Sequence, residues 1–223
     1  MPDIAELDEW LTFSSECEAV LMEKKSKFIA AGRFAETGAE AEVFLQNRRK
    51  LHRDAKHHAF ALRTGITRTG AAERCSDDGE PAGTAGLPIL RLMRQARVQY
   101  AVIVVTRYFG GILLGTGGLA RAYGASAKLL LEKENLIQKV HCQKFSLTVD
   151  YSFVGKIKNL IQNADVFTLD ILYDAQVTFV LLARDRTAGP FLKQASDAAC
   201  GGENAAMLEC LYHAYPFPPS QRA

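Results

Sequence analysis

The second half of the chain has the clearer alternation of apolar and polar positions. Residues 144–151 (KFSLTVDY) alternate as a half-buried strand does, whereas residues 154–161 (VGKIKNLI) carry apolar side chains at helical spacing. The pattern predicts a strand over 144–151, a helix over 154–161, a hairpin over 165–173 and 175–183, a helix over 187–199 and a strand over 206–215. The order β-α-β-β-α-β is that of a ferredoxin-like domain, in which two helices cover one face of a four-stranded antiparallel sheet.

The first half predicts a less regular α+β domain. Its expected elements are a hairpin over 16–22 and 27–34, a helix over 39–52, a strand over 57–63, a short helix over 87–94, a buried strand over 100–106 and a long helix over 117–134. The helix over 39–52 is expected to bury Val43, Phe44 and Leu51. Residues 64–86 are polar and glycine-rich, and they are expected to form a long connection of functional importance. The fold class is therefore α+β with two domains, residues 1–138 and 139–223.

Composition places the chain among ordinary soluble globular proteins. Of its 223 residues, 48% are hydrophobic and 23% are charged, which excludes a disordered tail, a collagen-like repeat and a coiled coil. No apolar run approaches the roughly 18 residues of a membrane-spanning helix. The acidic start, Met1 to Trp10, lacks the basic and apolar regions of a secretory signal. A cytoplasmic protein with no membrane partner is expected.

Five cysteines are spread along the chain without a C-x-x-C pair. An odd number at this spacing fits neither a disulfide framework nor a cysteine-rich zinc site. Buried, reduced thiols are expected at all five positions, which are Cys17, Cys75, Cys142, Cys200 and Cys210. The sequence predicts no metal ion and no cofactor.

The distribution of charge is more informative than the net charge of +2. Residues 1–139 hold 20 basic and 17 acidic residues, against 7 and 8 in the remainder. No acidic residue lies between Glu80 and Glu132, a stretch that contains Arg91, Arg94, Arg97, Arg107, Arg121 and Lys128. A second basic cluster comprises Arg48, Arg49, Lys50, Arg53 and Lys56. These segments form a phosphate-attracting face if they fold together, and otherwise they are solvated helix faces on different sides.

A glycine-rich turn between a buried strand and a helix is the first segment that could carry chemistry. Such a turn lets backbone N–H groups approach an anion, and Arg107 and Arg121 on either side could clamp a phosphate or carboxylate. The spacing is neither that of a P-loop nor G-x-G-x-x-G. The alternative is that the glycines only allow tight packing of the helix start. The glycines in question are Gly110, Gly111, Gly115, Gly117 and Gly118.

An acidic turn, Ser76–Gly86 (SDDGEPAGTAG), is the second such segment. Asp77, Asp78 and Glu80 offer the hard oxygen ligands that Mg²⁺ or Ca²⁺ prefers, but three acids on one tight turn do not encircle an ion. A turn at Asp78-Gly79, with Asp77 or Glu80 paired to Arg107 or Arg121, is the favoured alternative. Thr84 is more readily a turn residue than a nucleophile, and no catalytic residue is predicted.

Histidines and aromatic residues beside these segments leave two alternatives open. His57 and His58 are adjacent on a predicted strand, so they point to opposite faces and only one can face the loops. Tyr108 and Phe109 at the end of the central strand could stack on nucleobases. Alternatively, Phe109 fills the core and Tyr108 bonds to the loop, which is the arrangement that we expect.

The two segments together resemble the signatures of the IMPACT/YigZ family. The resemblance lies in DDGEPAGTAGLPIL (77–90) and VVTRYFGGILLGTGGLARAYG (104–124), with support from SKFIA (26–30) and HRDAKHHAFALR (52–63). It extends from about residue 20 to the end of the chain. Residues 56–58 depart from the family, which more often has Thr-His-Asn there, although His57 still aligns with the family's histidine.

The resemblance implies a fold and a kind of function. The first domain would have the β-α-β fold of the second domain of a small-subunit ribosomal protein, and the second would be ferredoxin-like. Eukaryotic members regulate translation by binding a ribosome-associated scaffold. The matching residues, implied to line one pocket, are His57, Asp77, Asp78, Gly79, Glu80, Pro81, Gly83, Thr84, Arg107, Tyr108, Gly110, Gly111, Gly115, Gly117, Gly118, Arg121 and Tyr123.

Three functional hypotheses follow. The leading one is a non-enzymatic, translation-related regulator that binds RNA, the ribosome or a ribosome-associated protein through the first domain. The second is an enzyme or small-molecule binder that holds a phosphorylated ligand between the Asp77–Glu80 loop and the Gly110–Gly118 turn. The third is an interaction module in which the ferredoxin-like half binds a protein and the signatures only stabilise the first domain.

Overall fold

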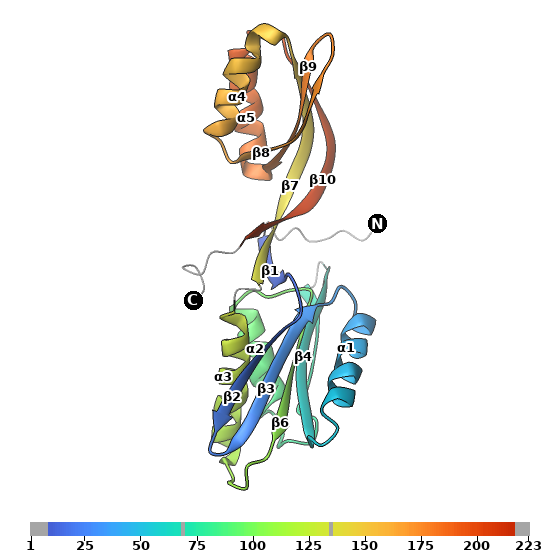
Figure 1. The fold of residues 1–223 in the computed structure, drawn as a ribbon, viewed down its shortest axis with the longest axis vertical. Helices are drawn as coiled ribbons and strands as arrows, with labels where there is room; N and C mark the ends of the chain where they lie inside the picture. The colour runs from blue at the N-terminus through green and yellow to red at the C-terminus, as the bar shows by residue number, and fades with distance from the viewer. Residues whose placement is uncertain (1–8, 68–69, 134–135, 217–223) are drawn as a thin grey trace. The chain divides into compact units, whose positions relative to one another are not determined.

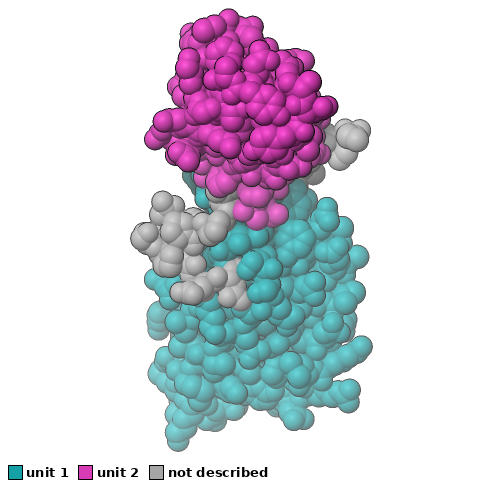
Figure 2. All heavy atoms as spheres, turned by 45° about the horizontal axis from the view of Figure 1, so that its top comes forward, with its two compact units in different colours: residues 1–138, 215–223 teal, residues 139–214 magenta. Residues whose placement is uncertain are grey.

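The computed structural model describes residues 9–67, 70–133 and 136–216. The chain divides into two compact units (Figure 2): unit 1 comprises residues 1–138 with 215–223, and unit 2 comprises residues 139–214. The expected acidic start, up to residue 8, and the proline-containing tail beyond Pro216 lie outside the described residues. Each unit mixes helices and strands around buried hydrophobic residues of its own, so the α+β class is confirmed.

Unit 1 is built on a five-stranded antiparallel sheet in the order β2-β3-β6-β4-β5 (Figure 1). The strands are β2 (Cys17–Glu23), β3 (Ser26–Phe34), β4 (His57–Thr67), β5 (Gly70–Ser76) and β6 (Ala101–Tyr108). The strand β1 (Glu9–Phe13) precedes them and makes a parallel bridge from Leu11 to Val98. β6 is central because it lies between β3 and β4, and its first seven residues are all buried, as the apolar run over 100–106 predicts for a buried strand.

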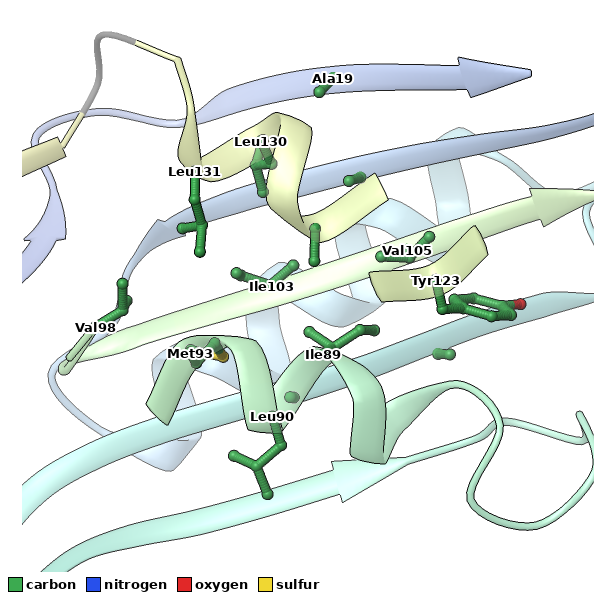
Figure 3. Packing of buried hydrophobic residues seen from close by; sticks show 14 of the residues in the cluster. Ala19, Ile89, Leu90, Met93, Val98, Ile103, Val105, Tyr123, Leu130 and Leu131 are labelled. Atoms are coloured by element: carbon green, nitrogen blue, oxygen red, sulfur yellow. The ribbon is translucent and has the colours of Figure 1, made fainter. Parts of the chain in front are cut away.

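Helices cover both faces of this sheet. α1 (Gly38–Leu51) lies on one face, where Phe44 and Leu45 pack on Val102 and Val104 of β6. α2 (Gly86–Gln95) and α3 (Gly115–Leu131) cover the other face, where Ile103 and Val105 meet the cluster shown in Figure 3. Alternate residues of β6 therefore serve two separate cores, which explains why the strand is apolar at successive positions.

Two details of unit 1 differ from the sequence prediction. The expected connection over 64–86 is wrong, because β4 continues to Thr67 and pairs with the edge strand β5. β5 is an edge strand with one neighbour, so many of its positions are exposed and its residues are small or polar. Apolar and polar residues therefore show no clear alternation along it. The inner face of α1 is also wrong in part: Phe44 is buried, but Val43 and Leu51 are exposed, and Ala41 and Leu45 lie inside instead.

Unit 2 has the ferredoxin-like topology that the sequence predicts. Its elements are β7 (Leu136–Val149), a 3₁₀ turn (Tyr151–Phe153), α4 (Val154–Gln162), β8 (Val166–Tyr173), β9 (Val177–Arg184), α5 (Asp185–Ala198) and β10 (Asn204–Pro216). The sheet runs β8-β9-β7, with β10 on the other side of β7. Phe145 and Phe179 of the sheet pack with Ile157 of α4 and Phe191 of α5.

All five cysteines are free thiols, but they are not all buried. Cys17 and Cys142 are buried and Cys75 is half-buried, whereas Cys200 and Cys210 are exposed, so the expectation of five buried thiols is wrong. Burial raises the pKa of the Cys17 thiol to about 11, which keeps it protonated. Among the helices of the described residues, none has the length and apolar content needed to cross a membrane.

Candidate functional site

Four connections of unit 1 meet at the end of the sheet where β6 finishes, and we call this the loop end (Figure 1). They are the β2–β3 turn, the α1–β4 connection, the β5–α2 loop and the β6–α3 loop. β3 and β4 both run antiparallel to β6, so their first residues lie beside its last ones: Lys27 is opposite Tyr108, and His57 is opposite Arg107. The two segments that the sequence singles out therefore lie at the same end of the domain.

Asp77 holds the β5–α2 loop to the start of α2. Its carboxylate accepts hydrogen bonds from the backbone N–H groups of Gly83, Ala85 and Gly86 at 2.8, 2.9 and 2.9 Å. Ala85, at the N-cap position of α2, has no side chain that could do this. Burial opposes ionisation of Asp77, but the three N–H groups together lower its pKa below the ordinary 3.8. Asp77 therefore acts as a cap contributed from outside the helix.

Replacing Asp77 with Asn is expected to lower the free energy of unfolding by about 1–3 kcal/mol at neutral pH, because charge-assisted hydrogen bonds are lost. A carboxyl with a lowered folded pKa stabilises the protein above its unfolded pKa and loses that effect as pH falls through the folded value. The difference between wild type and Asp77→Asn should therefore be constant above about pH 4 and shrink at lower pH. Urea unfolding at several pH values measures it. Asp54→Asn, at an exposed position, is the control, and a pH-independent difference would contradict the capping role.

Asp78 ties the same loop to α1 and β4. Asp78 and Gly79 have positive φ angles of 47° and 87°, which confirms the predicted turn. The Asp78 carboxylate accepts hydrogen bonds from Arg49 Nη2 and from the backbone N–H of His58, both at 2.7 Å. Its carbonyl oxygen lies 2.8 Å from His57 Nδ1. Asp78 is thus occupied by contacts within the fold.

Glu80 forms a buried ion pair with Arg107. Arg107 Nη1 lies 2.7 Å from Glu80 Oε1, and the two side chains are only 7% and 4% exposed. The hydroxyl of Tyr123 donates a second hydrogen bond to the same oxygen at 2.8 Å. Burial, together with the adjacent Glu80 carboxylate, raises the pKa of Tyr123, so its hydroxyl remains a donor. The predicted pairing between the acidic turn and the arginines is confirmed, with Glu80 and Arg107 as the partners.

Phe109 covers the guanidinium group of this ion pair. Arg107 lies 5.6 Å from the ring centroid of Phe28 and 5.4 Å from that of Phe109, within the range of cation–π interactions. Phe109 itself is 54% exposed, so the expectation that it fills the core is wrong. The space beneath it is already filled by Arg107. Tyr108 also departs from the expectation: its hydroxyl lies 3.0 Å from His52 Nδ1 in the α1–β4 connection.

The glycines of the β6–α3 loop have different structural roles. A Cβ at Gly110 would lie 2.0 Å from the carbonyl carbon of Lys25, so this glycine permits direct backbone contact with the β2–β3 turn. Gly111 and Gly115 have positive φ angles of 83° and 70°. At Gly117 and Gly118, in the first turn of α3, a Cβ would meet only side-chain atoms, at 3.7 and 3.1 Å. Ile112 and Leu113, between these glycines, are 41% and 84% exposed.

The structure does not place the two arginines around one anion site. Arg107 is buried and bonded to Glu80, whereas Arg121 is exposed on α3, with Nη1 3.7 Å from the position of a Cβ on Gly117. Thr84 is buried, and its hydroxyl donates to the carbonyl of Pro81 at 2.7 Å. In the described ranges, no group of three His, Cys, Asp or Glu residues is arranged to hold a metal ion.

Two histidines near the loop end are neutral at physiological pH. His58 is buried with Nδ1 3.1 Å from the Thr106 hydroxyl, and burial lowers its pKa below 6.5. Burial and then the nearby Arg48 lower the pKa of His52 in the same way. Neither imidazole therefore adds positive charge to the surface.

Exposed cations surround these loops, and we call them the basic set. They are Lys24, Lys25, Lys27, Lys50, Arg53, Lys56 and Arg121. The two basic segments of the sequence contribute only some of their cations to the basic set. Arg48 pairs with Glu18, Arg49 with Asp78 and Arg94 with Glu73. Sequence reasoning missed the three lysines of the β2–β3 turn. The run EKKSK at a predicted hairpin turn was the signal that could have identified them.

Comparisons with known proteins match both halves of the chain. Residues 24–131 match the Impact N-terminal domain, and residues 147–201 match a domain of unknown function, DUF1949. The chain is 31% identical to "IMPACT family member YvyE" of Bacillus subtilis, over 92% of this chain and 94% of the relative. It is 35% identical to "IMPACT family member YigZ" of Escherichia coli, over 86% and 92%. A crystal structure described as that of a hypothetical protein aligns with a TM-score of 0.58 at 31% identity, covering 92% of this chain and 99% of that one.

Proposed function

The chain belongs to the IMPACT family, and from this premise we propose that it is a non-enzymatic regulator of translation that binds ribosomal RNA through the loop end of unit 1. Eukaryotic relatives named Protein IMPACT, such as the human one, match over 80 residues at 41% identity. Those residues represent 35% of this chain and 24% of that protein, so the eukaryotic likeness concerns only part of either chain. The proposal therefore rests mainly on the charge of the loop end.

The observation that carries the proposal is the separation of acids from bases at the loop end. Asp78 is paired with Arg49 and Glu80 with Arg107, and the Asp77 carboxylate is bonded to backbone N–H groups, so all three carboxylates of the acidic turn are occupied by contacts within the fold. The basic set remains exposed around them, and Asp54 is the exposed carboxylate of the α1–β4 connection. A cluster of exposed cations on one side of a domain attracts the phosphates of a nucleic acid.

The same contacts favour binding over chemistry on a phosphorylated ligand. A phosphate held by Arg107 would have to displace Glu80 and leave that carboxylate buried without its cation, which is unfavourable by several kcal/mol. The carboxylate oxygen atoms of the acidic turn also bond to groups within the fold, so they are not free to bind a metal ion. Macromolecular phosphates, by contrast, need only the exposed cations.

The test is a salt titration of RNA binding by the full chain. Fluorescence anisotropy with a labelled single-stranded RNA of about 12 nucleotides should show binding that weakens steeply with salt, because bound phosphates release counterions. Replacing Lys27, Lys50 and Lys56 with Gln should lower the slope of log affinity against log salt by about 2. The wild-type protein should also co-sediment with bacterial ribosomes at low salt.

A control variant with the same change of charge separates local binding from general attraction. Arg91, Lys158 and Lys193 are exposed at other positions, and replacing all three with Gln should leave the slope nearly unchanged. An equal decrease of the salt slope in the two triple variants would mean that the loop end has no special role in RNA binding. A wild-type protein that binds no RNA at about 50 mM salt would overturn the proposal, whether or not it sediments with ribosomes.

A further inference from the structure

We propose that Phe109 is a stacking platform for an unpaired base, so that the nucleic acid bound at the loop end is single-stranded RNA. This inference rests on the proposed function and adds the class of RNA and the residue that selects it. Exposed cations alone would bind paired and unpaired strands alike, because they contact only phosphates. The discriminating feature must therefore be a group that contacts bases.

Phe109 is held at the surface by the packed side chains beneath it. Its ring lies over the Arg107 guanidinium, which is fixed from below by the Glu80 ion pair and packs on Phe28 on another side. The Nε of Arg107 is buried without a hydrogen-bond partner in the described part of the chain, and the guanidinium carbon lies 5.6 and 5.4 Å from the ring centroids of Phe28 and Phe109. Because Arg107 fills the space beneath it, the ring cannot sink into the core and stays 54% exposed.

The loop that follows Phe109 is held in place by backbone packing. Gly110 lies directly against Lys25 and Ser26, and its N–H donates to the Ser26 hydroxyl at 3.2 Å. This contact holds the backbone next to Phe109 in place, so less entropy is lost on binding than with a free loop. Ile112 and Leu113, further along the same loop, are also exposed apolar side chains.

Exposed cations belong to the same loop region as the ring. Gly110, the residue after Phe109, lies against the backbone of Lys25 in the β2–β3 turn, and Arg121 Nη1 lies 3.7 Å from the position of a Cβ on Gly117 at the start of α3. Exposed aromatic and apolar side chains together with cations match a chain in which flat bases alternate with phosphates. An acidic protein segment would match the charge, but it offers no regular flat surface for an exposed aromatic ring.

Single strands fit this arrangement better than duplexes. In an A-form helix the base faces are stacked on one another, and only phosphates, riboses and groove edges can be contacted. An unpaired base can leave its neighbours and stack on an exposed ring. Loops, bulges and strand ends of ribosomal RNA provide such bases.

The test compares single-stranded and double-stranded RNA binding by the full chain and two matched variants. Phe109→Leu keeps an apolar side chain but removes the flat ring. Phe34→Leu is the control, because Phe34 is 37% exposed and lies at the opposite end of β3, where it pairs with Ala101. Phe109→Leu should weaken binding to single strands by about tenfold and leave duplex binding within about twofold. Phe34→Leu should change neither, and circular dichroism should confirm that both variants are folded.

A second measurement locates the base directly. RNA carrying 5-iodouracil forms a covalent bond on irradiation with an aromatic side chain in contact with the base, and mass spectrometry should assign the bond to Phe109. Equal affinities of wild type and Phe109→Leu for single strands, with the salt dependence intact, would overturn the stacking role and leave the proposed function standing. Ribosome co-sedimentation without any affinity for free RNA would overturn both proposals in favour of a protein contact.

Discussion

Replacing Glu80 with Ala is expected to lower the free energy of unfolding of unit 1 by about 3–5 kcal/mol. The substitution leaves the Arg107 guanidinium buried without its counter-ion and also removes the acceptor for the Tyr123 hydroxyl. Isolated charges in a protein interior are far less stable than paired ones. The measurement is urea unfolding followed by the fluorescence of Trp10, the single tryptophan, which is buried in unit 1 and reports on that unit.

Two further variants separate the charge from the hydrogen bond. Tyr123→Phe removes only the hydroxyl donor and should lower the free energy of unfolding by about 1 kcal/mol. Glu80→Leu combined with Arg107→Met removes both charges and should recover most of the stability lost in Glu80→Ala. If Glu80→Ala costs no more than Tyr123→Phe, the ion pair does not stabilise the loop end in the way the geometry indicates.

The ferredoxin-like half was predictable because apolar and polar residues alternate along its first strand and β-branched and aromatic residues are concentrated in its hairpin. β7 has one face on the helices, so Phe145 and Leu147 are apolar while Ser146 and Thr148, which follow them, are polar. The same rule fails in unit 1. β6 is buried on both faces and gives an uninterrupted apolar run, and β5 is an edge strand whose small residues give no clear period. The sequence therefore predicted the central strand and the β2 edge of this sheet and missed the other edge, β5.

The candidate site was predictable in its segments but not in its contacts. The sequence placed the acidic turn and the glycine-rich loop together and expected an arginine to pair with an acid. It could not choose between Arg107 and Arg121, because the choice depends on which side chain points inward. Arg107 is on the central strand opposite Phe28, so it points toward the core, whereas Arg121 is on the outer side of α3. The inward position turns a candidate ligand-binding residue into a structural one.

The structural role of Arg107 also explains why Phe109 is exposed. A buried arginine at residue 107 fills the volume beneath Phe109, and Phe109 remains at the surface. The charge of Arg107 thus acts indirectly, by supporting a ring rather than by contacting a phosphate. Substitutions at Arg107 would combine loss of stability with loss of the ring's position, so Phe109→Leu is the cleaner test of binding.

Replacing Gly110 with Ala is expected to have the second large effect, a loss of about 3 kcal/mol in the stability of unit 1. The added Cβ would lie 2.0 Å from the Lys25 carbonyl carbon and 2.4 Å from the Ser26 nitrogen, and both are backbone atoms that cannot rotate away. The β2–β3 turn and the β6–α3 loop must therefore separate. Trp10 fluorescence in urea measures the loss of stability. Binding of single-stranded RNA should fall as well, because the residue beside Phe109 is displaced.

Two neighbouring glycines provide matched controls for this result. Gly111→Ala has open space around the new Cβ but a φ angle of 83°. It should therefore lower the free energy of unfolding by only about 1 kcal/mol. Gly117→Ala lies in the first turn of α3 and meets only Arg121 Nη1 at 3.7 Å, so it should be neutral or stabilising by up to about 1 kcal/mol. If Gly110→Ala were as mild as Gly111→Ala, the backbone contact with the β2–β3 turn would not hold the loop. The preordered position of Phe109 would then lose its structural basis.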